Sequence, residues 1–231
     1  REQGPQVGLA GLAERGLVVD HAHLEAAAGV LREAGYEPVV DVPVATGVAA
    51  GHHLSRMIKP GVAGFEIHWT IAAPDTGLAI DPQGLWARAK PVKIGPAKVL
   101  TLCPDDLLLH LCLHATHQHA MEMGLRPLCD LTVVIERYRD ELDWDAIQRR
   151  ARSWRCARGV YIALELGSRL IGVPAPAGAI LSLRPTAANT DAVLAVSDAM
   201  RPLGSFETWT ARRVSARVHG LNAQLERWVK E

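Results

Sequence analysis

Several common signatures are missing from this sequence, and each absence excludes a class of protein. No apolar run approaches the roughly 18 residues of a membrane-spanning helix, and no basic-then-apolar leader opens the chain. The four cysteines form no CxxC pair, so a reduced, cytoplasmic setting is the simplest interpretation. The patterns GxGxxG, GxxxxGK[ST] and GxSxG are also absent. The sequence therefore gives no support for a Rossmann, P-loop or α/β-hydrolase site.

The composition is that of a globular protein with no membrane partner. The chain has 231 residues, 48% of them hydrophobic, and a net charge of zero. Residues 1–145 carry 12 basic and 19 acidic side chains, whereas residues 146–231 carry 13 and 6. The basic half could attract a polyanion such as a nucleoside triphosphate or RNA, or simply hold the two halves together. We favour the second interpretation because the arginines at 149–158 spread around a helix, so a nucleic-acid partner has no specific support.

The pattern of apolar residues changes near residue 103. Before it, strands are expected at 16–20, 54–58 and 64–71, an irregular edge segment at 36–44, a turn at 47–51, a helix at 21–34, and short segments at 85–89 and 92–102. After it, helices are expected at 104–123, 125–139, 144–154, 156–171, 190–202 and 205–229. We therefore predict an α+β fold with two domains. Residues 1–103 would form a mixed β-sheet with flanking helices, and residues 104–231 an all-helical domain.

The most informative stretch is the expected strand at 65–71. Apolar and polar side chains alternate along it, so that one face of the strand carries Glu66, His68 and Thr70. A carboxylate and an imidazole two residues apart on one sheet surface suit metal binding or proton transfer. The alternative is a solvated strand face, which an isolated E-x-H pattern does not exclude.

Two groups of histidines suggest further sites. At 100° per residue, His110, His114 and His117 lie within about 60° of one another on a helix, and His119 points the opposite way. Three such imidazoles could hold zinc, although the glutamate of an H-E-x-x-H enzyme is missing. They could equally be packed histidines with one hydrogen bond each. His53, which follows His52 at a strand start, could face a phosphate or a turn.

Taken together, these stretches resemble the uncharacterised nucleotidyltransferase family, a branch of the polymerase-β-like nucleotidyltransferase superfamily. The matching pieces run in order over about residues 14–174: Val18-Val19-Asp20, His23-Leu24-Glu25-Ala26, Leu31-Arg32-Glu33-Ala34-Gly35-Tyr36, His52-His53-Leu54, Phe65-Glu66-Ile67-His68-Trp69, Leu85-Trp86-Ala87-Arg88-Ala89, Leu107-Leu108-Leu109-His110-Leu111-Cys112-Leu113-His114 and Asp130-Leu131. The resemblance implies a nucleotidyltransferase-like fold. It also implies transfer of a nucleoside monophosphate from a nucleoside triphosphate to an acceptor, which the sequence leaves unknown.

The resemblance also implies roles for individual residues. In the superfamily, two carboxylates in a D-x-D-like strand and a third on a neighbouring strand hold Mg²⁺ or Mn²⁺. Glu66 stands at the third position and Glu14 at the first, whereas Gly16 stands at the second and has no side chain to offer a cation. We assign Glu66 and Glu14 to metal binding, Glu66 and His68 to catalysis, and His53 and His114 to cofactor binding.

Because of Gly16, the metal site implied by the resemblance is incomplete. Since the first residue is Arg rather than Met, we expect the sequence to begin inside a longer product whose native N-terminus could complete the site. The alternative is a non-catalytic binding or regulatory module that keeps the fold. A third possibility is a metallohydrolase built on the helical histidines.

Overall fold

The computed structural model of the protein describes residues 8–10, 15–73, 76–119, 121 and 123–185. The chain divides into two compact units. Unit 1 comprises Arg1–Asp75 with Ile80–Cys103, and unit 2 comprises Thr76–Ala79 with Pro104–Glu231.

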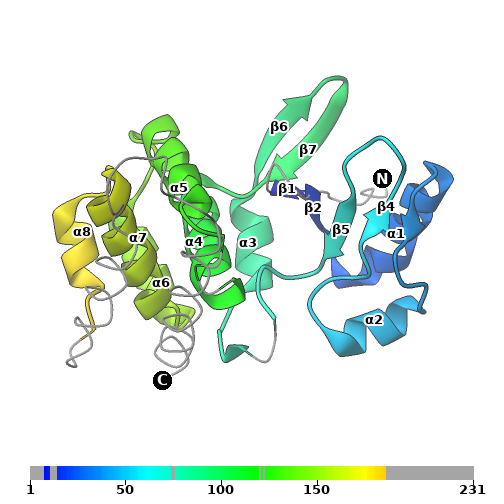
Figure 1. Ribbon diagram of the computed structural model, residues 1–231, viewed down its shortest axis with the longest axis horizontal. Helices are drawn as coiled ribbons and strands as arrows, with labels where there is room; N and C mark the ends of the chain where they lie inside the picture. The colour runs from blue at the N-terminus through cyan, green and yellow to red at the C-terminus, as the bar shows by residue number, and fades with distance from the viewer. Residues whose placement is uncertain (1–7, 11–14, 74–75, 120, 122, 186–231) are drawn as a thin grey trace, which may run out of the picture. The chain divides into compact units, whose positions relative to one another are not determined.

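Unit 1 contains a mixed β-sheet whose described strands follow the order β3-β4-β5-β2-β1-β7-β6 (Figure 1). The strands are β1 (Gly8–Ala10), β2 (Arg15–Val18), β3 (Glu37–Pro38), β4 (Met57–Ile58), β5 (Phe65–His68), β6 (Lys90–Ile94) and β7 (Ala97–Thr101). The β2–β5 and β1–β7 pairs are parallel, and the other neighbours are antiparallel. Its helices are η1 (His21–His23), α1 (Leu24–Glu33), α2 (Val44–Ala50) and α3 (Pro82–Arg88). The predicted α+β class is confirmed.

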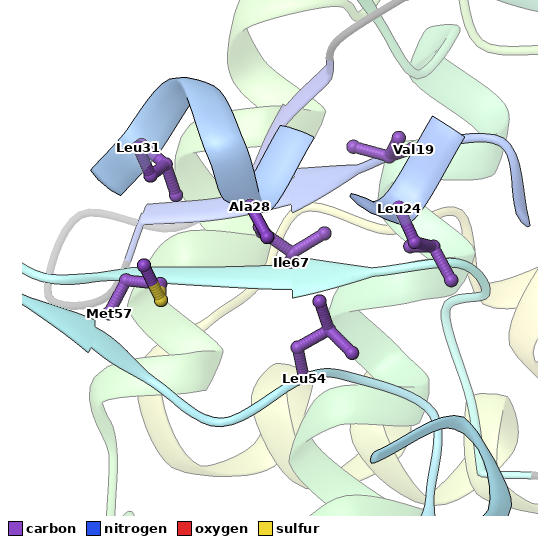
Figure 2. Close-up of a cluster of buried hydrophobic side chains, with 7 residues drawn as sticks. All are labelled: Val19, Leu24, Ala28, Leu31, Leu54, Met57 and Ile67. Atoms are coloured by element: carbon purple, nitrogen blue, oxygen red, sulfur yellow. The ribbon is translucent and has the colours of Figure 1, made fainter. Parts of the chain in front are cut away.

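A small apolar core holds helix α1 against the centre of this sheet. Figure 2 shows its seven buried side chains: Val19, Leu24, Ala28, Leu31, Leu54, Met57 and Ile67. Leu24, Ala28 and Leu31 recur at the spacing of one helix face, which is why this face of α1 is buried. Ile67 on β5 is fully buried in the same cluster. Because side chains alternate along a strand, Glu66 and His68 project from the opposite face of β5.

Several elements of unit 1 differ from the expectation: β1 was not expected, and β4 and β5 are shorter than the strands expected at 54–58 and 64–71. Gly35 ends α1 with φ +83°, and the Gly95-Pro96 turn joins β6 to β7, as expected. Val44–Ala50 forms helix α2 where a turn was expected at 47–51. Pro82–Arg88 forms helix α3, capped by Asp81, where we expected the end of a loop over 73–84 and a short segment at 85–89. The Asp81 carboxylate accepts a hydrogen bond from the Gly84 N–H at 2.9 Å, a cap that the loop-like composition of this stretch hid.

Unit 2 is helical throughout its described part. It contains α4 (Pro104–Leu113), η3 (His114–Gln118), α5 (Arg126–Arg137), α6 (Trp144–Ser153), α7 (Ala157–Ile171) and α8 (Ala177–Ser182). Four of the expected helices are present here, but the one expected at 104–123 ends its α-helical part at Leu113 and continues as one π-helical turn, η3. Helix α8 was not expected, and the helices expected at 190–202 and 205–229 lie outside the described residues.

A buried ion pair joins two helices of unit 2. The carboxylate of Asp106, fully buried in α4, lies 2.7 Å from the Arg150 guanidinium of α6. Arg150 also lies 3.8 Å from Asp105. A buried charge without a partner costs several kcal/mol, so this ion pair fixes how α4 and α6 face each other. Among the described residues, no helix is long and apolar enough to cross a membrane.

Candidate functional site on strand β5

The polar face of β5 carries a hydrogen-bonded glutamate and histidine. Nε2 of His68 lies 3.3 Å from Oε2 of Glu66, and the two side chains are only 19% and 20% exposed. Because an ionised carboxylate can only accept, Nε2 of His68 is the protonated nitrogen, and a neutral ring then has its lone pair at Nδ1. The pair therefore combines a partly buried negative charge with an imidazole held in one tautomer.

The surroundings keep Glu66 ionised. The hydrogen bond from His68 holds the pKa of the Glu66 carboxyl below its usual value, despite an opposing contribution from burial. Positive charge on His53, His68 and Arg56 lowers this pKa further. Arg56 was not singled out in the sequence. The expected hairpin could have indicated it: Met57 pairs with Phe65, so Arg56, the residue before Met57, comes near Glu66.

Two more histidines pack beside His68. His53 forms an antiparallel bridge with His68, and their ring centroids are 5.0 Å apart. The His52 ring lies 4.7 Å from His53 and 5.4 Å from His68. Nδ1 of His53 donates to the Leu54 carbonyl at 2.8 Å, which leaves Nε2 as the accepting nitrogen of the neutral ring. We refer to Glu66, His68, His52 and His53 as the β5 cluster.

Strand β2 runs alongside the β5 cluster without adding a carboxylate. In the parallel register, Gly16 is paired with Glu66 and Val18 with His68. The position at which the resemblance expects a second carboxylate therefore lies directly beside Glu66, and a residue without a side chain occupies it. Glu14, the expected first metal ligand, lies outside the described residues.

The histidines of the expected zinc face belong to unit 2 and are arranged differently from the prediction. His117 lies against Thr116, with Nδ1 donating to that hydroxyl at 3.1 Å, because the hydroxyl itself donates to the Cys112 carbonyl. Burial lowers the pKa of His117 to about 4. His114 instead contacts His119, the residue expected on the opposite face. The expectation that His119 points away from His114 is wrong because η3 is a π-helical turn and does not follow the spacing of 100° per residue.

The described residues do not fit a metal centre made of protein side chains alone. No three His, Cys, Asp or Glu side chains within this part of the chain are gathered so that they could hold an ion. On the β5 cluster, Glu66 is the carboxylate, and Gly16 beside it supplies no ligand. A pair of divalent ions held by several carboxylates does not match this donor set.

The parallel β2–β5 pair and the carboxylate on β5 agree with what the family resemblance implies, a carboxylate on a strand next to the one that includes Gly16. The sequence model of a family described as "Uncharacterised nucleotidyltransferase" matches residues 16–172, more than half of the chain, and the protein belongs to this family. Neither the curated proteins nor the solved structures gave a match to the chain. The match begins at Gly16, the residue paired with Glu66.

Proposed function

We propose that the protein binds a nucleoside triphosphate at the β5 cluster and transfers the nucleoside monophosphate to an acceptor that has yet to be identified. The supporting observation is the parallel β2–β5 pair, which puts Glu66 beside the strand position where the family resemblance expects a carboxylate. Family membership supports nucleotidyl transfer in general terms. A divalent cation such as Mg²⁺ would neutralise phosphate charge. The described residues do not form its complete site.

In this proposal the Glu66–His68 pair handles the proton of the acceptor. Glu66 accepts from Nε2 of His68 and so presents the unprotonated Nδ1. Nδ1 takes the proton of an acceptor hydroxyl while the hydroxyl oxygen forms a bond to the α-phosphorus. The bond between the α-phosphorus and the bridging oxygen breaks, and pyrophosphate leaves with the electron pair. Glu66 stabilises the imidazolium that results.

His53 supports binding rather than proton transfer in this scheme. It lies beside His68, and its Nε2 carries the lone pair of the neutral ring, so we propose that it contacts the cation that accompanies the phosphates. We keep the expected role of Glu14 as a cation ligand as part of the proposal. His114 belongs to unit 2, and the reaction scheme assigns no step to it.

One observation favours a second candidate, a non-catalytic nucleotide-binding module. Gly16 stands where a second carboxylate is expected, and one carboxylate holds a divalent cation only weakly, so that little of the phosphate charge would be neutralised. Such a module would bind nucleotide through the β5 cluster and release no pyrophosphate. It differs from the transferase in turnover and not in binding.

Calorimetric titration with each of the four ribonucleoside triphosphates and Mg²⁺, followed by an assay of pyrophosphate release in the presence of a mixture of proteins and small hydroxyl compounds as acceptors, tests both candidates. Binding that is lost in Glu66→Gln but kept in Glu25→Gln, an exposed carboxylate on α1, supports the site. Pyrophosphate release that falls in His68→Ala then supports the transferase, whereas binding without release supports the module. Absence of binding contradicts both.

A further inference from the structure

The chain after α4 departs from α-helical geometry in two places. Residues 114–118 form the π-helical turn η3, and Met121 adopts a left-handed conformation with φ +62° although it is not glycine. Met121 is 1% exposed, and its N–H donates to the Ala115 carbonyl at 2.7 Å. Both π-helical turns and left-handed non-glycine residues cost free energy and are frequent at functional sites. The surrounding structure must therefore stabilise this turn.

The turn brings together two histidines that an α-helix would separate. Five residues along a regular helix place side chains roughly 140° apart. In η3, however, the ring centroids of His114 and His119 are 4.4 Å apart, and their Nε2 atoms are separated by 3.2 Å. The His119 N–H also donates to the His114 carbonyl at 3.2 Å, which fixes the backbone of the pair. His110, one turn earlier, has its ring 5.9 Å from that of His114.

The separation of the two Nε2 atoms matches one edge of a zinc coordination sphere. Zinc binds imidazole nitrogen at about 2.0–2.1 Å in tetrahedral geometry, which puts two such ligands about 3.3 Å apart. A hydrogen bond between two neutral imidazoles fits 3.2 Å as well. The two interpretations differ in one respect: an amide can replace one imidazole in a hydrogen bond, whereas it is a poor ligand for a borderline cation.

We propose that His114 and His119 form a binding site for a divalent transition-metal ion of the zinc class. The remaining coordination positions would be filled by water, and by His110 after rotation of its side chain. Two imidazoles are thus close together before the ion arrives, and among the described residues no third ligating side chain is yet gathered with them. Bound metal would tie the two ends of η3 together and stabilise unit 2. This site goes beyond the proposed nucleotidyl transfer.

The experiment uses the full chain, stripped of metal with a chelator that is then removed, and Zn²⁺ alone as the probe in calorimetric titration. One equivalent is expected to bind to the wild type, and thermal unfolding should shift upward with zinc concentration. His114→Ala and His119→Gln should each weaken zinc binding at least roughly tenfold. His21→Ala, which removes an exposed histidine of unit 1, is the matched control and should bind as the wild type does.

His119→Gln separates the two interpretations of the pair. Glutamine can keep a hydrogen bond to His114, so its melting temperature without zinc should stay near the wild-type value, and far-UV circular dichroism verifies the fold. Unchanged zinc affinity in this variant would overturn the proposal. So would zinc binding that disappears in His53→Ala and persists in His114→Ala, or a wild type that binds no zinc. Nucleotide binding plays no part in these outcomes.

Discussion

Gly16 and Glu66 are paired residues on the parallel strands β2 and β5. Side chains of laterally paired residues project from the same face of a sheet, so a side chain at position 16 would lie next to the Glu66 carboxylate. A single substitution can therefore test whether this face is a weakened metal-dependent nucleotide site.

Gly16→Asp should increase the Mg²⁺ affinity of the nucleotide complex. Two neighbouring carboxylates attract a divalent cation more strongly than one, and we expect a gain of roughly tenfold or more. Titration of Mg²⁺ at a fixed concentration of nucleoside triphosphate measures the effect. Gly16→Asn has nearly the same shape without the charge and should show little gain. Equal behaviour of the two variants would count against a cation beside Glu66.

His68→Ala should raise the pKa of the Glu66 carboxyl toward its usual value. The hydrogen bond from His68 is the largest cause of the lowered pKa, and the variant removes it while the desolvation of Glu66 remains. An NMR titration that follows the side-chain carboxyl carbon of Glu66 measures the shift. Glu25→Gln, at an exposed position of α1, should leave the titration unchanged. A pKa that does not rise would show that the hydrogen bond is absent in solution.

His117 should cause the free energy of unfolding of unit 2 to fall in acid. Burial lowers its pKa from 6.5 to about 4, so the unfolded chain binds a proton between these two values and the folded chain does not. Stability is therefore greatest above pH 6.5 and falls as the pH drops toward 4, by up to about 3 kcal/mol from this residue. Urea unfolding at a series of pH values measures the fall. In His117→Gln the slope over this interval should be smaller, and an unchanged slope would exclude His117 as its source.

Gly159→Ala should destabilise unit 2. A Cβ atom at this position of α7 would meet the His117 ring and lie 2.7 Å from the Thr116 hydroxyl, both of them parts of the buried turn. Overpacking of this kind costs about 1–3 kcal/mol. Gly178→Ala in α8 is the matched control, because a Cβ atom added there would point into open space, and it should be neutral or slightly stabilising. Chemical denaturation measures the free energy of unfolding of both variants. Equal values for the two would contradict the packing of α7 on η3.

The fold followed from local sequence signals where these were strong. Three local patterns predicted parts of the fold. The alternation around Ile67 predicted strand β5, the apolar face of residues 21–34 predicted helix α1, and Gly35 predicted where this helix ends. The turn predicted at 47–51 was wrong. Gly47 and Gly51 favour a turn by propensity, but this segment packs against the apolar core around Leu54 and is stabilised there as helix α2.

The candidate site was only partly predictable for a related reason. Glu66 and His68 are neighbours on one strand, so their spacing alone predicted the contact. The pairing of Gly16 with Glu66 depends on the parallel register between distant segments; the family resemblance implied neighbouring strands but not this register. The His114–His119 contact depends on a π-helical turn, which no simple periodicity in the sequence indicates. The cytoplasmic setting stays a prediction.

The most direct test of the account is the location of bound nucleotide. In a backbone-amide NMR titration of the full chain with Mg²⁺ and a triphosphate whose α,β-bridge cannot be cleaved, the account predicts that the largest shifts cluster at Gly16, His53, Glu66 and His68. It also predicts that these shifts disappear in Glu66→Gln. Saturable binding whose shifts lie elsewhere, with the amides of β2 and β5 unaffected, would contradict the proposed site.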